Sequence, residues 1–330
     1  MGTTRTEFDP YLNDPLEWGA SMAHHEEIMR ACLDAVGARS IVEVGAYAGD
    51  LTRVLMDWAA GAGARVVAID PSPQDGLVAL AAERDGLELF RQTSLAALPE
   101  IPIPDVAIID GDHNYYTVGE ELRLLAERAP GSDLPLLLFH DVCWPHGRRD
   151  DYFDPEQIPA PYRQPVVGEG AGIAPWDPGV SPDGLPYPRS AAREGGEHNG
   201  VLTAVDDFVA SNDSLRLAVV PAFFGFGAVW HRDAPWAERV AQVLDPYDRH
   251  PLLERLEANR VLHIAREHAL RVALWQAQAR QARQERLLGR LLQSSAFALA
   301  ERLSRLRVRV GIAPDQSVIS REEVRRALGE

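Results

Sequence analysis

The chain contains no lysine: all 33 basic residues in its 330 positions are arginine. Schiff-base catalysis, pyridoxal-phosphate attachment and a Walker-type phosphate loop each need the primary amine of a lysine, so the sequence excludes all three. Cysteine is almost as scarce: Cys32 and Cys143 are the only two. Two cysteines give neither a disulfide framework nor a cysteine-based metal site.

Long apolar runs are also missing. No segment reaches the roughly 18 consecutive apolar residues that a membrane-spanning helix needs. The amino end lacks the charged-then-apolar pattern of a secretory signal, so we expect a cytoplasmic protein without a membrane span. With 46% hydrophobic and 25% charged residues the composition is that of a globular chain, and its length favours one large domain with additions.

Charge is distributed unevenly along the chain. Residues 260–310 hold 11 arginines against three glutamates, although the net charge of the whole sequence is -16. The remainder is therefore strongly acidic. Such a surface repels a phosphate backbone, which argues against a nucleic-acid partner.

Apolar runs alternate with amphipathic stretches over the first part of the chain, which favours a parallel sheet with helices on both faces. The runs lie near residues 40–45, 65–70, 87–90, 105–110 and 134–140. Two further runs, 215–221 and 224–231, are joined by a turn too short for a parallel crossover, so they pair antiparallel. The sequence thus predicts an α/β fold whose sheet is mostly parallel and ends in an antiparallel strand.

Residues 142–200 interrupt this alternation with ten prolines and nine glycines, too many for a helix or a central strand. The same segment carries six large aromatic side chains, which disordered segments usually lack. We therefore expect an ordered lid within a catalytic domain at residues 1–235. It follows the fifth strand, at the carboxyl edge of the sheet where open α/β folds bind their ligands.

The remaining residues, 236–330, are expected to form an arginine-rich helical extension. Leucines recur at helical spacing between residues 251 and 310, which predicts two long amphipathic helices. These helices would pack on each other or join copies of the chain into a homo-oligomer, and a basic face docked on an acidic partner or membrane surface is the alternative. The spacing of Ser320 and Glu323 is that of a capping box and predicts a last helix over 321–328.

The stretch from Ser40 to Asp50 has the pattern of a strand, a tight glycine turn and a helix. Gly45 and Gly49 have no Cβ, so the backbone can approach a ligand closely, while the helix start offers unpaired N–H groups. The next strand ends at Asp70, about 20 residues later, where a carboxylate can accept hydrogen bonds from ribose hydroxyls. A dinucleotide site would have the same acid but would normally show a third glycine.

This pattern resembles the class I S-adenosylmethionine-dependent methyltransferases, whose first motif is an acid followed by Gly-x-x-x-Gly and whose second strand ends in an acid. The resemblance covers roughly residues 20–235 and implies a Rossmann-like sheet that binds S-adenosylmethionine. Asp70 would hold the ribose, and Ser94 falls where this fold usually contacts adenine. The other residues implied in the cofactor pocket, mainly around the methionine part, are Glu43, Gly45, Ala46, Tyr47, Gly49 and Asp110.

Two buried strands end in polar residues. Asp110, Asp112 and His113 follow the fourth strand, and His140 and Asp141 end the fifth. Adjacent parallel strands lie about 4.8 Å apart, so these side chains can converge. A helix cap accounts for Asp112 alone and a sheet-end hydrogen bond for Asp141 alone, but the five together predict a functional cluster.

The Asp-x-x-His spacing and the polar pair after the next strand resemble the metal-dependent small-molecule and sugar O-methyltransferases. That resemblance implies Asp110, His140 and Asp141 as ligands of a divalent ion such as magnesium or manganese, and His113 as the general base. His140 departs from the group, which usually has a carboxylate there, and imidazole suits softer ions than magnesium. Either another divalent ion binds, or the site works without metal through a paired His113 and Asp141.

We therefore expect an O-methyltransferase of secondary metabolism that acts on a hydroxyl of a small molecule such as a sugar or glycosylated metabolite. The sulfonium methyl of the cofactor is already activated, so the enzyme needs mainly to align the acceptor and remove its proton. Arg148, Arg149 and Arg163 are candidates to bind an anionic substituent of the acceptor. Three alternatives stay open: N-methylation without metal, a metal-dependent hydroxylase or hydrolase, and a non-catalytic binding or scaffold protein that uses the C-terminal helices.

Overall fold

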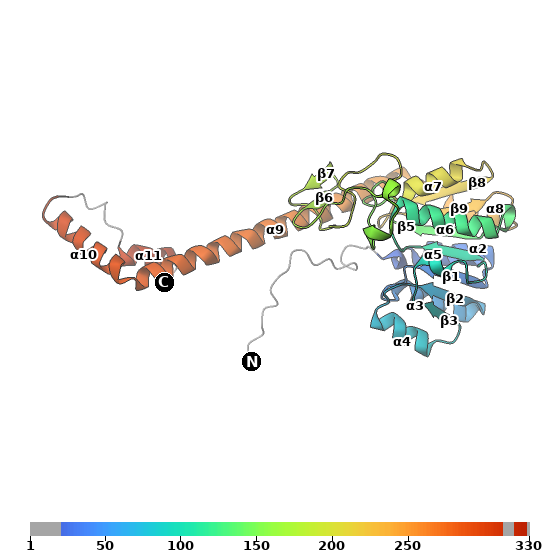
Figure 1. Ribbon diagram of the computed structural model, residues 1–330, viewed down its shortest axis with the longest axis horizontal. Helices are drawn as coiled ribbons and strands as arrows, with labels where there is room; N and C mark the ends of the chain where they lie inside the picture. Colours follow the sequence, from blue (N-terminus) through green and yellow to red (C-terminus); the bar gives the residue numbers. More distant parts are fainter. Residues whose placement is uncertain (1–20, 313–319, 329–330) are drawn as a thin grey trace. The chain divides into compact units, whose positions relative to one another are not determined.

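The computed structural model describes residues 21–312 and 320–328. Internal contacts divide the described residues into two compact units, of which one contains residues 21–268 and the other contains residues 269–312 and 320–328. The first unit holds all the described strands, and the second holds the C-terminal helices (Figure 1).

A seven-stranded sheet forms the centre of the first unit, in the order β3-β2-β1-β4-β5-β9-β8. Its strands are β1 (Ser40–Val44), β2 (Arg65–Ile69), β3 (Leu87–Phe90), β4 (Val106–Ile109), β5 (Leu136–His140), β8 (Leu215–Val220) and β9 (Phe226–His231). Strands β1 to β5 pair in parallel, whereas β9 runs antiparallel to both β5 and β8. The predicted Rossmann-like sheet with an antiparallel last strand is confirmed.

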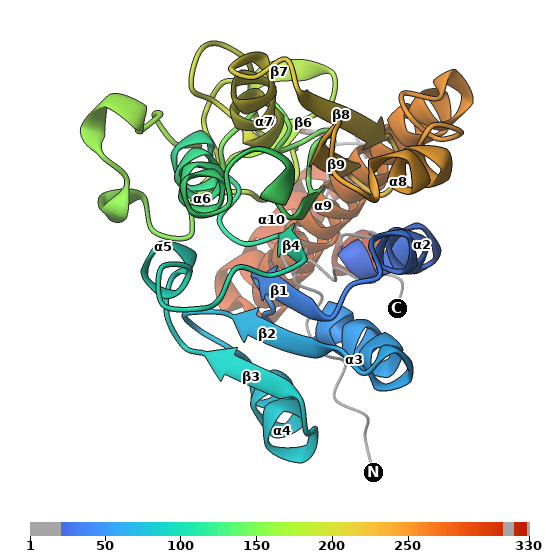
Figure 2. The same ribbon diagram turned by 90° about the vertical axis from the view of Figure 1, so that its right-hand side faces the viewer.

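Helices cover both faces of this sheet (Figure 2). One face carries η1 (Met22–His25), α2 (Glu26–Val36), α3 (Asp50–Ala62) and α8 (Ala237–Leu244); the other carries α5 (Ser94–Ala97), α6 (Tyr115–Arg128) and α7 (Val201–Ala210). The remaining short elements are α4 (Asp75–Glu83), after β2, and η2 (Gly131–Asp133), before β5. Ile41 belongs to the first core and Val42 to the second, because successive side chains of a strand point to opposite faces. Burial on both faces explains why the strands have continuous apolar runs in the sequence.

The insertion between β5 and α7 is ordered. It contains the hairpin of β6 (Gly172–Ala174) and β7 (Asp177–Ser181) and the short turns η3 (Pro155–Gln157) and η4 (Ala160–Tyr162). Asp150 fastens it: its carboxylate accepts the backbone N–H groups of Tyr115 at 2.8 Å and Gly200 at 2.6 Å. The hydroxyl of Tyr152 donates to the same carboxylate at 2.8 Å. The predicted lid is therefore a wall held by buried hydrogen bonds.

The long helix α9 (Pro251–Gln293) begins in the first unit, where Glu257 is buried, and continues into the second. It is followed by α10 (Ser295–Arg309) and α11 (Arg321–Leu328). The predicted capping box is confirmed, since Glu323 Oε2 accepts the Ser320 backbone N–H at 2.8 Å and the Glu323 N–H donates to Ser320 Oγ at 3.2 Å. Because α8 and the first turns of α9 complete the core, the sheet unit extends past the boundary expected at residue 235.

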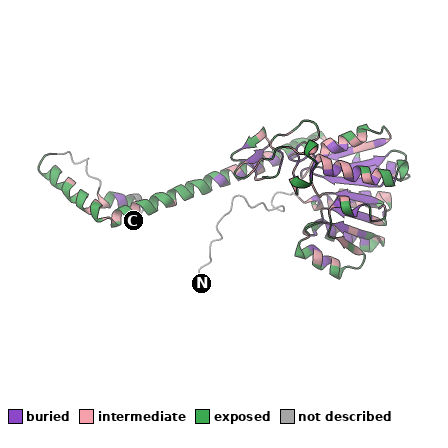
Figure 3. Cartoon of the chain, viewed as in Figure 1, coloured by how far each residue is buried: buried purple, intermediate pink, exposed green. Residues whose placement is uncertain are grey.

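Most residues along the helices of the second unit are exposed (Figure 3), and many of the exposed ones are leucines. Leu270, Leu274, Leu299, Leu303 and Leu306 are each more than half exposed. Exposed leucines at this density are typical of a surface that a partner covers. Among the helices of residues 21–312 and 320–328, none combines the length and apolarity needed to cross a membrane.

Candidate active site

A cavity of about 630 Å³ opens where the parallel strands end. It is lined by residues that follow β1, β2 and β4, by the start of α5 and by the insertion. Small-molecule sites usually measure about 300–1,000 Å³, so its size suits a cofactor with an acceptor. The cofactor residues expected from the sequence that line it are Glu43, Gly45, Ala46, Tyr47, Asp70, Ser94 and Asp110. Gly49 does not line it.

The glycine turn brings the end of β1 against the end of β4. Gly45 has a φ of +87°, and a Cβ there would lie 2.0 Å from the carbonyl oxygen of Asp110, so no larger residue fits. Gly49 has a φ of +83° and caps the start of α3, which explains why it lies off the cavity wall. Between them Tyr47 has a φ of 40° and is 59% exposed. The turn is thus as tight as the two glycines predict.

Asp70, at the end of β2, is buried and ties the glycine turn to the following loop. Its Oδ2 accepts the Tyr47 N–H at 2.7 Å, and its Oδ1 accepts the Ser72 N–H at 2.7 Å. A carboxylate has about four lone-pair sites, so these two bonds leave acceptor capacity for ribose hydroxyls. The ribose contact stays a prediction, and the structure adds a role for Asp70 in shaping the turn.

Glu43, in β1, is 1% exposed and accepts a hydrogen bond from Thr52 Oγ1 at 2.7 Å. Burial raises the pKa of the Glu43 carboxyl to about 8. The group is therefore largely protonated at neutral pH. It can ionise when a cation binds beside it, because a nearby positive charge favours the carboxylate.

Four titratable side chains, which we call the inner cluster, converge beyond the ends of β4 and β5: Asp110, His113, His140 and Asp141. His113 Nε2 lies 3.3 Å from Asp110 Oδ1 and 3.2 Å from Asp141 Oδ2. His140 Nδ1 lies 3.2 Å from the same Asp110 oxygen and 3.5 Å from the same Asp141 oxygen. Each imidazole therefore lies within reach of both carboxylates. Asp110, His113 and Asp141 line the cavity, whereas His140 does not and is 1% exposed.

Hydrogen bonding fixes the protons of the inner cluster. His140 Nε2 lies 2.9 Å from the Phe223 carbonyl oxygen, which can only accept, so this nitrogen carries a proton. Burial alone would lower the pKa of His140, but the facing carboxylates of Asp110 and Asp141 outweigh it and raise the pKa to about 9. Burial opposes protonation of His113 as well, and the same two carboxylates raise its pKa to about 10. Two imidazolium groups thus balance two carboxylates.

The loop between β8 and β9 holds His140 in place. Phe223 and Phe224 have φ values of 46° and 68°, a region that bulky residues rarely adopt. Glu257 of α9 stabilises this conformation by accepting both N–H groups, at 3.0 Å and 2.7 Å. The Phe223 carbonyl is thereby directed at His140. Non-glycine residues in such conformations cluster at functional sites.

The fifth polar residue expected in the cluster, Asp112, lies apart from the inner cluster and anchors the insertion. Its Oδ1 accepts the Phe153 backbone N–H at 2.8 Å, and its Oδ2 accepts the Thr117 hydroxyl at 3.0 Å. Both groups belong to the elements around the cavity. Asp112 therefore fixes the position of the cavity wall.

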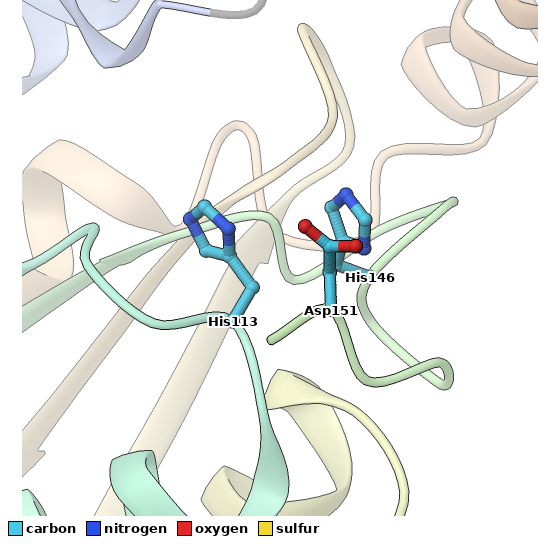
Figure 4. Close-up of side chains that lie close together, drawn as sticks. All are labelled: His113, His146 and Asp151. Atoms are coloured by element: carbon cyan, nitrogen blue, oxygen red, sulfur yellow. The ribbon is translucent and has the colours of Figure 1, made fainter. Parts of the chain in front are cut away.

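Two insertion residues, His146 and Asp151, complete the site, and no sequence motif indicated either. The rings of His146 and His113 stack at a centroid distance of 5.4 Å and an interplanar angle of 10°. The backbone N–H of Asp151 donates to the His113 carbonyl at 2.9 Å. One possible ligand atom from each of the three lies within 4.8 Å of the others (Figure 4). An irregular segment has no periodicity from which the direction of a side chain can be predicted.

Arg148, Arg149 and Arg163 of the insertion do not line the cavity. Arg148 pairs with Asp206, whereas Arg149 and Arg163 donate to backbone carbonyls of the insertion itself. Their expected role in binding an anionic substituent is therefore contradicted. Among the described lining residues Arg189 is the only arginine. Eight acidic residues line the cavity: Glu43, Asp50, Asp70, Asp110, Asp112, Asp141, Asp151 and Asp154. Glu43 is largely protonated, and Asp110 and Asp141 are balanced by the two imidazolium groups, so the other five outnumber Arg189.

Comparison with known proteins agrees with this geometry. Residues 42–142 match the family model of a methyltransferase domain, and this segment contains every residue that the sequence analysis assigned to the cofactor, metal or base. No curated protein matches the chain. The predicted methyltransferase domain is thus confirmed over the glycine turn and the inner cluster.

The solved structures that are similar to the chain include the following three. The methyltransferase PaMTH1 of Podospora anserina, bound to SAH, has 14% identity and a TM-score of 0.41, covering 67% of this chain and 83% of that one. A putative caffeoyl-CoA O-methyltransferase from Staphylococcus aureus has 9% identity and a TM-score of 0.38, with coverages of 67% and 85%. A putative O-methyltransferase from Klebsiella pneumoniae has 14% identity and a TM-score of 0.38, with coverages of 69% and 92%.

Proposed function

We propose that the chain is an S-adenosylmethionine-dependent O-methyltransferase that acts on a hydroxyl of a small molecule, such as a sugar or glycosylated metabolite. One observation carries this proposal: a single cavity is lined both by the glycine turn with Asp70 and by Asp110, His113 and Asp141. A donor and an acceptor in one enclosed space satisfy the main requirement of methyl transfer, which is alignment of the reacting atoms.

The cofactor would occupy the part of the cavity around the glycine turn. Glu43 and the turn from Gly45 to Gly49 would surround the methionine part, with Asp70 at the ribose and Ser94 at the adenine. The buried carboxyl of Glu43 supports this orientation, because it is the group that an incoming ammonium would ionise. The bound cofactor supplies an activated methyl group, and the protein supplies orientation and electrostatics.

The resemblance implies a divalent ion held by Asp110, His140 and Asp141, and in the structure one possible ligand atom each of Asp110, His113 and Asp141 lies within 4.8 Å of the others. The place that such an ion would take faces two imidazole nitrogens, each within 3.5 Å of both carboxylates. The other nitrogen of His140 donates to the Phe223 carbonyl, which fixes the orientation of the ring. The inner cluster is balanced in charge by its own residues, and the proposed chemistry takes no ion there.

His113 is the proposed general base, and its environment defines how it would act. The two carboxylates hold it in the protonated form, with a pKa raised to about 10. Only the deprotonated fraction accepts a proton from the acceptor hydroxyl. Turnover limited by this base therefore rises with pH, because that fraction grows about tenfold per pH unit below the pKa.

The excess of carboxylates along the cavity favours a second candidate, the N-methylation of an amine. A protonated amine is attracted to such a wall, whereas an anionic acceptor such as a nucleotide diphosphate sugar is repelled. An amine acceptor needs no metal. The two candidates differ in the atom that carries the new methyl group.

The exposed leucines of the second unit support a homo-oligomer joined through α9 and α10, which we propose as the association mode. A cytoplasmic location and the absence of a nucleic-acid partner remain predictions from the sequence.

The function is tested in two steps. Calorimetry of the full chain with S-adenosylhomocysteine measures the cofactor site, and the absence of binding at millimolar ligand would refute the family assignment. Incubation with S-adenosylmethionine labelled in its methyl group and an extract of the source then yields a labelled product. Its NMR spectrum separates an O-methyl from an N-methyl group and identifies the acceptor.

A further inference from the structure

We propose that His113, His146 and Asp151 form a binding site for one divalent transition ion of the zinc type, where the loop after β4 meets the insertion. The inner cluster supports this site and is not its ligand set. The existence of the site does not depend on the proposed methyl transfer.

The three side chains come together from two separate segments. His113 follows β4, while His146 and Asp151 belong to the insertion (Figure 4). Their ligand atoms lie within 4.8 Å of one another, and ligands of one zinc ion lie about 3–4 Å apart, given bonds of about 2.0–2.2 Å. The three ligand atoms would thus need to move only slightly closer together to bind one ion. The Asp151 N–H bond to the His113 carbonyl already holds the two segments together.

The inner cluster prepares His113 to be a ligand. Its Nε2 faces Asp110 Oδ1 and Asp141 Oδ2, so Nδ1 is the nitrogen that can bind an ion once it has released its proton. Figure 4 shows a ring nitrogen of His113 on the side of Asp151. A histidine that ligates a metal almost always donates its other N–H to a carboxylate or carbonyl, which fixes the ring. In His113 this other nitrogen, Nε2, faces the carboxylates of Asp110 and Asp141.

His146 provides an independent indication of a missing ligand. Its side chain is 4% exposed, and its Nδ1 lies near the Arg149 backbone without a hydrogen bond of normal geometry. Buried polar atoms are nearly always paired, so this atom calls for an explanation. Asp151 is oriented by the Ser190 hydroxyl, which donates to its Oδ1 at 2.6 Å and leaves Oδ2 available.

The donor set defines the chemical class of the ion. Two imidazoles and one carboxylate suit borderline ions such as zinc and cobalt better than magnesium. Three protein ligands leave one position open, and all three residues line the cavity. On the proposed function, that position would take the acceptor hydroxyl, and the ion would lower its pKa so that its proton passes to solvent. His113 would then be a ligand, and the ion would replace it as the activating group.

Metal titration of the full chain tests the site. After treatment with a chelator the protein is titrated with cobalt, whose visible spectrum reports the number and type of ligands, and with zinc in competition. We expect one equivalent to bind, with affinity at least 100-fold lower in Asp151→Asn and in His146→Gln. Asp141→Asn should lose 10- to 100-fold, the usual effect of removing an outer partner. Asp154→Asn, an acid of the same wall, is the matched control and should bind normally.

Three results would overturn the proposal. The first is no stoichiometric binding at 100 μM ion by the unaltered chain. The second is normal binding by Asp151→Asn, a near-isosteric change that keeps the Ser190 bond. The third is that Asp110→Asn loses ion binding whereas Asp151→Asn retains it, which would place the ion in the inner cluster. Binding of S-adenosylhomocysteine, measured on every variant, shows that the pocket is folded. If the ion binds normally but no methyl group is transferred, the proposed function is refuted and the ion site is not.

Discussion

The buried carboxyl of Glu43 makes the stability of the protein depend on pH in a way that one substitution isolates. An ordinary glutamate has a pKa near 4.5, whereas burial raises the pKa of Glu43 to about 8 in the folded state. Between these values the folded state binds more protons than the unfolded state, so the free energy of unfolding falls as pH rises. The slope is about 1.4 kcal/mol per pH unit, and the loss approaches about 5 kcal/mol above pH 8.

Glu43→Gln removes this loss, because the amide is neutral at every pH and its oxygen still accepts the Thr52 hydroxyl. We expect the variant and the unaltered chain to have similar stabilities at pH 5. At pH 9 the variant should be more stable by several kcal/mol, a large part of the roughly 5–15 kcal/mol of a typical domain. Burial also raises the pKa of Glu121 to about 8. Both proteins contain Glu121, so its contribution to the pH dependence cancels in the difference between their stabilities.

Urea unfolding at pH 5, 7 and 9, followed by circular dichroism, measures this difference. Glu120→Gln, which removes a surface partner of Arg123, is the control, and its effect should stay within about 1 kcal/mol at every pH. A difference between Glu43→Gln and the unaltered chain that is the same at pH 5 and pH 9 would refute the reasoning. With the cofactor, calorimetry in two buffers of different ionisation enthalpy should show about one proton released on binding at pH 7, and none in the variant.

The remaining predictions concern the ribose contact, the base and the second unit. Asp70→Ala should weaken binding of S-adenosylhomocysteine by about 1.5–3 kcal/mol in calorimetry, as expected for lost bonds to a charged group; unchanged affinity would remove Asp70 from the site. If His113 is the base, initial rates should rise with pH towards about 10, and His113→Ala should lower turnover by about 10²- to 10⁴-fold with a deficit that shrinks at high pH. A flat profile would contradict that role. A chain truncated after residue 268 should still bind the cofactor product but scatter light as a smaller particle, and an unchanged association state would exclude an interface in residues 269–330.

The sequence located the elements whose signals are local. Strands buried on both faces have continuous apolar runs, so β1 and β2 could be placed to within a residue. Gly45 and Gly49 marked the turn because the backbone has a positive φ at both positions, which favours glycine, and because at Gly45 it lies too close to Asp110 for a Cβ. The capping box at Ser320 placed α11, since both of its hydrogen bonds join residues three apart.

The arrangement of the site depends on contacts that no local pattern records. His140 is oriented by a carbonyl 83 residues away, and that carbonyl is held by Glu257 on a helix counted as part of the extension. His146 and Asp151 lie in a segment rich in proline, where neither the helical nor the strand period applies. Arg149 is an error of the opposite kind, a residue assigned to the site that does not belong to it. Its position in a loop suggested contact with a ligand, but its side chain is fully buried and donates to backbone carbonyls.

The charge of the cavity limits the reaction more narrowly than the fold does. S-adenosylmethionine carries a positive sulfonium and a positive ammonium, and methyl transfer removes the sulfonium charge. A wall in which carboxylates such as Asp70 and Asp112 far outnumber Arg189 therefore attracts the donor more strongly than the spent cofactor. The same wall disfavours a free alkoxide beside it. An O-methyl acceptor must consequently lose its proton within the transfer step or beside a cation, and the imidazolium of His113 or an ion held with His146 and Asp151 would supply that charge.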